Sequence, residues 1–410
     1  MTETEHPPHP QTPDSIAGVI VAEGGRVTFA RFMELALTHP TLGYYPRVDR
    51  LLRRSGDFST APALSPFFNH AVARLITELL DAALTATPPQ APSLGPSASP
   101  AGTRAGVIEL GGGEGHAAEA VLRLWDEERP KLREHVSYRI LEVGPRLRAT
   151  QGAAVEGLRA KGWNVAWGSD LAAACAHTRP AVIMGNEFLD ALPVHLVRVD
   201  DDGLRECHVE GAAGELREAW GPLSDAAASE AGLLFGTLDP GRLAALTRDG
   251  CLELSSSLDS LFTRLAAVMP TGSLLSIDYG EWFPGLPPTA ERWGGESLPL
   301  RGRTIRGYFR HQMVSDTLAR PGRQDLTADV DFAAVDLHGR RHGFETVLFT
   351  SLAAFLRAAG AEAELAALEE GTACTASDPI EADRQATVLR SLLDERDLGG
   401  AFKVMLQVKE

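Results

Sequence analysis

The chain has 410 residues, of which 44% are hydrophobic and 23% are charged. This composition is that of a globular protein, and the length predicts either two domains or one large domain with insertions. The formal net charge of -16 argues against a nucleic-acid partner, because proteins that neutralise phosphates usually carry a basic surface. No run of about 18 apolar residues indicates a membrane span.

The first 13 residues form an acidic, proline-rich segment that we expect to be a disordered tail. They lack the apolar stretch of a signal peptide and the arginine-rich character of a mitochondrial transit peptide. The four cysteines are scattered with no C-x-x-C pair, so no metal site and no disulfide framework is predicted. This cysteine usage suits a reducing compartment, and we predict a cytoplasmic protein.

Residues 14–85 are predicted to form an N-terminal helical region. Apolar residues recur at helical spacing after Val27, and Ser65 with Pro66 supplies the N-cap and first position of a second helix. Residues 86–105 are rich in Pro, Ala, Ser and Gly. We expect this segment to be a flexible insertion, because it has little apolar surface to bury.

Strand and helix signals alternate over residues 106–193, beginning with the strand GVIEL and the helix HAAEAVLRLWDEE. This alternation predicts an α/β fold, in which helices cover both faces of a parallel, Rossmann-like sheet. The pattern breaks over residues 194–250, where Asp202 and Gly203 indicate a hairpin turn, and this segment is predicted to be an insertion or cap. Residues 251–410 are predicted to complete the core.

Three glycines, Gly111, Gly113 and Gly115, follow the first strand of the core. Their spacing is G-x-G-x-G, whereas a dinucleotide loop has G-x-G-x-x-G and a triphosphate loop continues with Gly-Lys-Ser/Thr. Glu114 would repel a pyrophosphate, since a like charge at 4 Å costs roughly 4 kcal/mol at an effective dielectric near 20. A phosphate-free nucleoside such as S-adenosylmethionine is therefore favoured, with a ligand-free glycine turn as the alternative.

Polar residues follow each of the next three strands. Glu142 ends the second strand, where a carboxylate can accept hydrogen bonds from both ribose hydroxyls. Ser169 and Asp170 follow the third strand and suit an adenine amino group, although an Asp before a helix is also a common N-cap. Asn186 and Glu187 follow the fourth strand and are predicted to lie over the open carboxyl edge of the sheet.

Asp190 lies three residues after Glu187, so the two carboxylates would share one side of a helical segment. Paired carboxylates suit a guanidinium, which is planar, carries five donors and stays protonated. Methylating a guanidinium requires orientation by hydrogen bonds and a route for the departing proton. We therefore predict Glu187 and Asp190 as catalytic residues; their alternative is to cap the next helix.

Several stretches resemble the MidA-like family, which includes bacterial proteins and a mitochondrial assembly factor of respiratory complex I of the protein-arginine methyltransferase type. In chain order they are FARFMELALTHPTLGYY, SGDFSTAPALSPFF, VIELGGGEG, NEFLDALPVH, SIDYG, TIRGYFRHQMVSDTLARPGRQDLTADVDF and GGAFKVM. The resemblance implies a methyltransferase sheet with N-terminal helices and a substrate-covering insertion. It also implies S-adenosyl-L-methionine as methyl donor and a protein arginine as acceptor, which in the mitochondrial relative belongs to a respiratory complex subunit.

The resemblance assigns further residues by motif position. It implies that a segment before the core closes over the cofactor, and that this segment contains Gly56, Asp57, Phe58 and Thr60. It also implies that the acceptor side is lined by residues of a later segment, namely Arg306, Tyr308, Arg310 and His311. A solvated network of ion pairs is the alternative for the last two. Relatives typically carry a proline and an arginine in the glycine loop, where this chain has Gly112 and Glu114.

The sequence thus predicts an S-adenosylmethionine-dependent methyltransferase that acts on an arginine of a partner protein. Two alternatives stay open: methylation of a small molecule, and a non-catalytic assembly chaperone that binds the cofactor.

Overall fold

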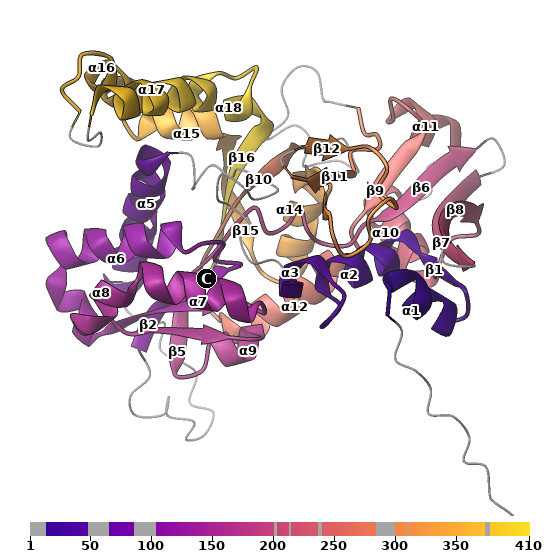
Figure 1. Ribbon diagram of the computed structural model, residues 1–410, viewed down its shortest axis with the longest axis horizontal. Helices are drawn as coiled ribbons and strands as arrows, with labels where there is room; N and C mark the ends of the chain where they lie inside the picture. The colour runs from indigo at the N-terminus through magenta and orange to yellow at the C-terminus, as the bar shows by residue number, and fades with distance from the viewer. Residues whose placement is uncertain are drawn as a thin grey trace, which may run out of the picture.

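The computed structural model of the chain describes most of the sequence. The described residues are 14–47, 65–85, 104–200, 203–212, 215–236, 240–283, 300–310, 312–373 and 378–410. The predicted tail and almost all of the predicted insertion at residues 86–105 lie outside them. Figure 1 shows a central sheet flanked by helices, a second sheet at one end of the molecule and the C-terminal helices as a separate layer at another.

The central sheet has the strand order β15-β16-β10-β5-β2-β3-β4, and a short strand, β14, pairs with β10. Strands from β10 to β4 run parallel to their neighbours, whereas β16 is antiparallel to β10 and β15. The strands are β2 Arg104–Leu110, β3 Val136–Leu141, β4 Val165–Gly168, β5 Thr178–Asn186, β10 Gly272–Glu281, β14 Val330–Asp331, β15 Glu345–Ser351 and β16 Phe402–Lys409. The predicted α/β fold with a parallel, Rossmann-like sheet is confirmed.

Helices cover both faces of this sheet because successive strand residues point to opposite faces. Val107 packs into an apolar cluster with α5, α6 and the C-terminal helices, whereas Ile108 packs into a second cluster with α9, α12 and α14. The helices of the two layers are α5 Pro66–Thr85, α6 His116–Glu128, α7 Pro145–Ala154, α8 Glu156–Ala160, α9 Leu171–Ala174, α12 Ser257–Val268, α14 Phe332–Arg341, α15 Leu352–Ala358, α16 Ala361–Glu369, α17 Pro379–Leu393 and α18 Leu398–Ala401, with a 3-10 turn at Pro130–Glu134.

The order of strands along the chain reverses at β2. The chain passes from β2 to β3 and β4 on one side of the sheet, and then to β5 and β10 on the other. Open parallel sheets bind ligands in the crevice beyond the carboxyl ends of their strands at such a reversal. The crevice of this sheet lies beyond Leu110 and Asn186, the last residues of β2 and β5.

The predicted insertion forms a second, antiparallel sheet together with part of the N-terminal region. Its order is β1-β7-β6-β9, and β8 pairs with β7. The strands are β1 Arg26–Thr28, β6 His195–Asp200, β7 Gly203–Ala212, β8 Glu215–Gly221 and β9 Cys251–Leu254, and the helices packed around them are α1 Ile16–Ala22, α2 Phe29–Thr38, α3 Tyr44–Arg47, α10 Asp225–Phe235 and α11 Pro240–Ala245. The N-terminal helices and the cap therefore share one apolar cluster.

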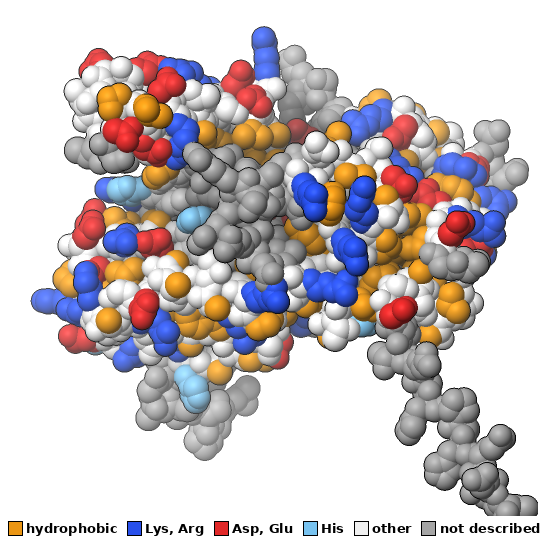
Figure 2. All heavy atoms as spheres, viewed as in Figure 1, with side chains coloured by type: hydrophobic (Ala, Val, Ile, Leu, Met, Phe, Trp, Pro, Cys, Tyr) orange, Lys and Arg blue, Asp and Glu red, His pale blue; other side chains and the backbone are white. Residues whose placement is uncertain are grey.

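A small third sheet, β12-β11-β13, carries two of the predicted acceptor-side residues, Arg306 and Tyr308, on strand β11. Its strands are β11 Arg306–Phe309, β12 Gln312–Val314 and β13 Asp325–Thr327. Figure 2 shows Lys and Arg side chains gathered near β11, β12 and α3, although the chain as a whole is acidic. Within the described residues, no helix combines the length and the apolar character needed to cross a membrane.

Candidate functional site

The glycine loop turns the chain from β2 into α6 at the carboxyl end of the sheet. Gly111, Gly113 and Gly115 have φ angles of 69°, 51° and 93°, a region that residues with a Cβ rarely adopt. The amide of Gly115 donates to the carbonyl of Gly112 at 2.8 Å, which closes the turn. Gly111 is exposed, so its main chain is accessible to a ligand in the crevice.

Gly112 could not carry a side chain without a shift of its neighbours. A Cβ at this position would lie 2.7 Å from Cγ2 of Ile140 and 3.1 Å from Nε2 of Gln151. The side chain of Glu114 is only 12% exposed, and its Oε2 lies 3.8 Å from Nε2 of His116. The two departures from the family's loop therefore fit the packing of this chain.

Glu142 lies immediately after β3 and is directed toward the glycine loop. Its carboxylate is buried and accepts hydrogen bonds from the amide of Gly144 at 2.8 Å and from Nε2 of Gln151 at 3.1 Å. The same Nε2 donates to the carbonyl of Gly113 at 2.9 Å. Burial raises the pKa of Glu142, and the hydrogen bonds from Gly144 and Gln151 oppose this effect.

Ser169 and Asp170 are exposed at the carboxyl end of β4. Asp170 is the N-cap of α9, and its Oδ1 accepts a hydrogen bond from the amide of Ala173 at 2.8 Å. One oxygen of Asp170 therefore caps α9, as in the capping alternative. Binding of an adenine amino group stays a prediction.

Glu187 follows β5 in a strained conformation. Its φ of 50° is rare for a residue other than glycine, and such a residue costs on the order of 1–3 kcal/mol. The amide of Glu187 donates to the carbonyl of Ile277 at 2.9 Å, and Nδ2 of Asn186 donates to its Oε1 at 3.3 Å. Oδ1 of Asn186 is buried and has no hydrogen-bond partner among the described residues, so it is available to a ligand.

The predicted helical segment from Glu187 to Asp190 is wrong, because these residues form an irregular turn. The carboxylate of Asp278, at the carboxyl end of β10, explains the difference. Its Oδ2 accepts hydrogen bonds from the amides of Phe188, Leu189 and Asp190, at 3.0, 2.8 and 3.3 Å. With its amides held in this way the segment forms no helix, so the alternative in which Glu187 and Asp190 cap a helix is also excluded.

Asp190 and Asp278 form part of a group of buried carboxyl groups. Burial and the neighbouring Glu187 raise the pKa of Asp278 to about 8. Burial, together with Asp278 and Asp325, raises the pKa of Asp190, and Arg306 opposes this effect. Tyr45 donates from its hydroxyl to Oδ1 of Asp325 at 3.2 Å. The group therefore extends from the β5 edge to β13 and α3.

The raised pKa of Asp278 predicts a pH-dependent stability. This carboxyl stays protonated in the folded protein up to about pH 8 but ionises near pH 4 on unfolding, so stability falls as pH rises between these values. The free energy of unfolding of the wild type is expected to fall by up to about 1.4 kcal/mol per pH unit relative to Asp278→Asn, which carries no such carboxyl. Guanidinium denaturation at pH 5 and pH 7.5 measures the difference.

Asp126→Asn is the control for this experiment, because Lys161 and Trp163 lower the pKa of Asp126. The stability that Asp126 contributes is present throughout this pH range, so its variant is expected to lose the same amount at both pH values. Parallel pH profiles for the wild type and Asp278→Asn would contradict the assignment of a protonated Asp278.

Arg306 and Tyr308 lie beside the group of buried carboxyl groups that contains Asp190. Nη1 of Arg306 donates to Oδ1 of Asp329 at 2.6 Å and Nε donates to the hydroxyl of Tyr308 at 3.0 Å. The guanidinium carbon of Arg306 also lies 5.8 Å from the ring centroid of Tyr279. In contrast, Arg310 is exposed at the β11–β12 turn, where its guanidinium carbon lies 5.2 Å from the ring centroid of Phe309.

The remaining predicted residues lie outside the described part of the chain. They are Gly56, Asp57, Phe58, Thr60 and His311. The structure thus brings together the glycine loop with Glu142, and separately Glu187 and Asp190 with Arg306 and Tyr308. Phe188 lies between the two groups. A Cβ on Gly111 would lie 3.4 Å from Cδ2 of Phe188, and the amide of Phe188 donates to Oδ2 of Asp278 at 3.0 Å.

A model of a protein family matches residues 95–350, well over half of the chain, and carries the description "Putative S-adenosyl-L-methionine-dependent methyltransferase". The chain belongs to this family. The predictions of a methyltransferase and of S-adenosyl-L-methionine as its cofactor are confirmed, and the residues of the crevice fit this cofactor. The glycine loop offers bare main chain, Glu142 offers a carboxylate, and Asn186 offers a buried amide oxygen.

Curated relatives from Danio rerio, Xenopus tropicalis and Homo sapiens are each named Protein arginine methyltransferase NDUFAF7, mitochondrial. They are 27%, 28% and 26% identical to the chain, over 78%, 75% and 75% of its length. The matches cover 69%, 66% and 64% of the relatives, so the chain spans about two thirds of their length. The resemblance to the MidA-like family is confirmed.

Two crystal structures of relatives from Burkholderia thailandensis share the fold. One, bound to S-adenosyl-homocysteine, is 29% identical with a TM-score of 0.70 and covers 96% of this chain and 92% of that chain. The other, a native structure, is 28% identical with a TM-score of 0.67 and covers 96% of this chain and 91% of that chain.

The prediction of a cytoplasmic protein is corrected by these comparisons. The curated relatives are named mitochondrial, which points to a mitochondrial rather than a cytoplasmic location. The composition of the first residues, on which the prediction relied, is therefore not a sufficient guide to location in this family.

Two residues of the crevice were missed by the sequence analysis. Gln151 on α7 is fully buried and contacts both the glycine loop and Glu142, and nothing in the sequence around it marks that role. Glu109, two residues before Gly111, is buried and accepts a hydrogen bond from the hydroxyl of Tyr138 at 2.9 Å. Burial raises the pKa of Glu109 to about 7. Its position inside the apolar run GVIEL could have marked Glu109 as a buried carboxyl group.

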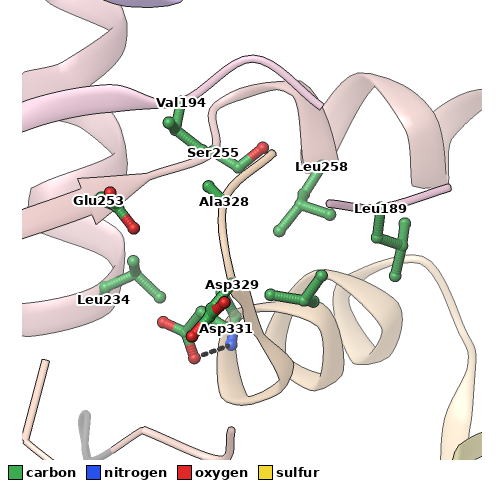
Figure 3. Close-up of a pocket in the computed structure, with 11 residues that line it drawn as sticks. Leu189, Val194, Leu234, Glu253, Ser255, Leu258, Ala328, Asp329 and Asp331 are labelled. Carbon is green, nitrogen blue, oxygen red and sulfur yellow. Dashed lines mark hydrogen bonds between the residues drawn. The ribbon is translucent and has the colours of Figure 1, made fainter. Parts of the chain in front are cut away.

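A cavity of about 30 Å³ lies behind the turn that carries Leu189. Figure 3 shows aliphatic side chains around it, together with the carboxylates of Glu253, Asp329 and Asp331. Such a volume holds about two water molecules and is too small for an arginine side chain.

Proposed function

We propose that this chain transfers a methyl group from S-adenosyl-L-methionine to an arginine side chain of a partner protein. The observation that carries the proposal is the group of carboxyl groups at the carboxyl ends of β5 and β10, directly beside the glycine loop. Glu187, Asp190 and Asp278 lie there, and Phe188 packs against both parts. The negative charge of Glu187, beside the protonated carboxyl groups of Asp190 and Asp278, favours a cationic acceptor that donates hydrogen bonds, such as a guanidinium.

The cofactor would be held by the glycine loop and by polar residues of the neighbouring strand ends. We assign the ribose to Glu142, the adenine to Ser169 and Asp170, and the methionine portion to the edge formed by Asn186. Bound S-adenosyl-L-methionine supplies a methyl carbon activated by its sulfonium. Glu187 would orient the acceptor guanidinium by hydrogen bonds, and its carboxylate would receive the proton that the nitrogen loses as the N–C bond forms.

Arg306 and Tyr308 would shape the acceptor side of the crevice. Arg306 is held by Asp329 and Tyr308, so its charge partly offsets the excess of carboxylates around Asp190. Without the charge of Arg306, repulsion among the carboxylates would raise their pKa values further. More of them would then be protonated, and a protonated carboxyl group does not attract a cation. Arg310, at the exposed turn, would contact the partner protein at a distance from the acceptor.

The class of partner protein is also a proposal. The MidA-like resemblance implies a subunit of a respiratory complex as acceptor, and the curated relatives named protein arginine methyltransferases support an arginine over a small molecule. We therefore propose a protein of the respiratory chain as the substrate, recognised by a segment that places one arginine in the crevice.

The experiment that tests the function has two readouts. S-adenosyl-homocysteine at about 100 times its Kd is expected to stabilise the fold by about 2.7 kcal/mol, seen as a rise in Tm. A methyl group labelled on the donor is expected to appear on arginine in a mitochondrial lysate, as located by mass spectrometry. No Tm shift at saturating ligand would contradict cofactor binding. A Tm shift without labelled protein would favour a non-catalytic assembly chaperone.

A further inference from the structure

Gln151 makes three hydrogen bonds from a fully buried carboxamide. Its Nε2 donates to the carbonyl of Gly113 at 2.9 Å and to Oε2 of Glu142 at 3.1 Å, and its Oε1 accepts from Nε1 of Trp167 at 2.7 Å. Its exposed fraction is 0%. One side chain thus connects the glycine loop after β2, the carboxylate after β3 and a ring on β4.

This network fixes the orientation of the amide. Both hydrogens of Nε2 and one lone pair of Oε1 are used, so the flipped amide would place oxygen against the Gly113 carbonyl and the Glu142 carboxylate. It would also set an NH₂ group against the indole N–H of Trp167. The observed orientation is therefore the one that leaves each buried polar atom paired.

The glycines of the loop leave room for this side chain. A Cβ on Gly112 would lie 3.1 Å from Nε2 of Gln151, and a Cβ on Gly115 would lie 3.2 Å from its Cα. Contacts of this kind are tighter than side chains ordinarily adopt. The loop therefore rests directly on Gln151, and the two positions are bare partly to admit it.

We propose that Gln151 is a positioning residue for S-adenosyl-L-methionine: its carboxamide holds the main chain of Gly113 and the carboxylate of Glu142 in the arrangement that one ligand requires. The inference rests on the proposed roles of the glycine loop and Glu142. Gln151 acts through these residues, because it is buried beneath them.

The electrostatics of Glu142 give this role a distinctive signature. Burial raises the pKa of Glu142, while the hydrogen bonds from Gly144 and Gln151 and the charge of Arg148 lower it. The charge of Glu142 in turn contributes to the raised pKa of Glu109. Loss of the Gln151 hydrogen bond would raise the pKa of Glu142 further. A protonated Glu142 accepts hydrogen bonds from the ribose less well, so affinity would then fall at low pH.

The test measures the Kd of S-adenosyl-homocysteine by calorimetry from pH 5.5 to pH 8.5, with Tm recorded at each pH. Gln151→Leu keeps a similar volume and removes both donors. Its affinity is expected to fall roughly ten- to a hundredfold at pH 5.5, the loss of a hydrogen bond to a charged group, and to recover in part at pH 8.5. The wild-type Kd is expected to change less over this range.

Gln407→Leu is the matched control, because Gln407 is another fully buried glutamine, on β16 and away from the glycine loop. It is expected to lower Tm with the Kd and its pH profile unchanged. A merely structural role of Gln151 predicts the same result for Gln151→Leu as for this control, and that result would overturn the proposal.

Gln151→Asn covers the case in which Gln151→Leu does not fold. It keeps the amide but withdraws it by one methylene, so it is expected to show the same pH-dependent loss of affinity. Wild-type affinity of Gln151→Asn at every pH would overturn the proposal. Failure of the wild type to bind S-adenosyl-homocysteine would instead contradict the proposed function, so the two failures are distinguishable.

Discussion

Glu187→Gln is expected to reduce methyl transfer to an arginine-containing protein by at least about 100-fold in kcat/KM, while the Kd for S-adenosyl-homocysteine changes by less than about twofold. Glutamine retains the shape of the side chain and an oxygen that can accept from Asn186, so the turn after β5 is preserved. The charge that would orient and balance a guanidinium is lost. A charge removed at the reacting nitrogen affects the transition state more than cofactor binding.

The measurement combines transfer of labelled methyl groups with calorimetry on the same preparation. Glu119→Gln, which removes a carboxylate of α6 that is 29% exposed and pairs with Arg123, is the control and is expected to leave both readouts unchanged. If Glu187→Gln transfers methyl groups at the wild-type rate, the acceptor is held elsewhere in the crevice. If cofactor affinity falls in parallel, Glu187 belongs to the cofactor site instead.

Glu187 also affects the pKa values of neighbouring groups, and Glu187→Gln is expected to change them. Its charge contributes to the raised pKa of Asp278 and Tyr279. Neutralising it would therefore lower the pKa of Asp278 toward its ordinary range. The pH-dependent loss of stability described for Asp278 is then expected to become shallower in the same variant, which ties the two measurements to one group of carboxyl groups.

Features set by neighbouring residues in the chain could be predicted from the sequence. Ser65 caps α5 through its hydroxyl, which accepts from the amide of Phe68 at 3.2 Å. The glycine loop and Glu142 fall at the ends of β2 and β3 because apolar strand runs end where the chain turns polar. The α/β fold followed from the same alternation.

Features set by residues distant in the sequence could not be predicted in this way. The turn from Glu187 to Asp190 is held by Asp278, whose carboxylate comes from 88 residues further along the chain to bind the amide of Asp190. Local spacing therefore predicted a helix where a long-range acceptor captures the amides. Gln151 is similar, since its partners Gly113 and Trp167 lie on other β-α units.

The N-terminal region shows the same limit at a larger scale. Val27 pairs with Val209 in the cap sheet, so a segment expected to precede the core as helices also contributes an edge strand to the insertion. Strands that lie so far apart in the sequence pair without any local sequence pattern that predicts the pairing. One consequence is that α3, within this region, brings Tyr45 to Asp325, close to the residues proposed for the acceptor side.

Glu142→Gln is expected to weaken binding of S-adenosyl-homocysteine by roughly 100-fold at every pH from 5.5 to 8.5. Glutamine has one acceptor oxygen where the carboxylate has two, and a hydrogen bond to a charged group contributes about 1.5–3 kcal/mol. In the wild type Oε1 of Glu142 accepts from the amide of Gly144 and Oε2 accepts from Nε2 of Gln151, so in either orientation the new NH₂ group would face one of these donors. Calorimetry with a denaturation curve separates lost affinity from lost stability.

The pH profile distinguishes this variant from Gln151→Leu. Glu142→Gln has no carboxyl to titrate, so its weak binding is expected to stay flat, whereas Gln151→Leu recovers affinity as pH rises. In a double-mutant cycle the two losses are expected not to add, because Gln151 acts through Glu142. Glu156→Gln, which changes an exposed carboxylate on α8, is the control. Additive losses would contradict the action of Gln151 through Glu142. An unchanged Kd for Glu142→Gln would place the ribose away from Glu142.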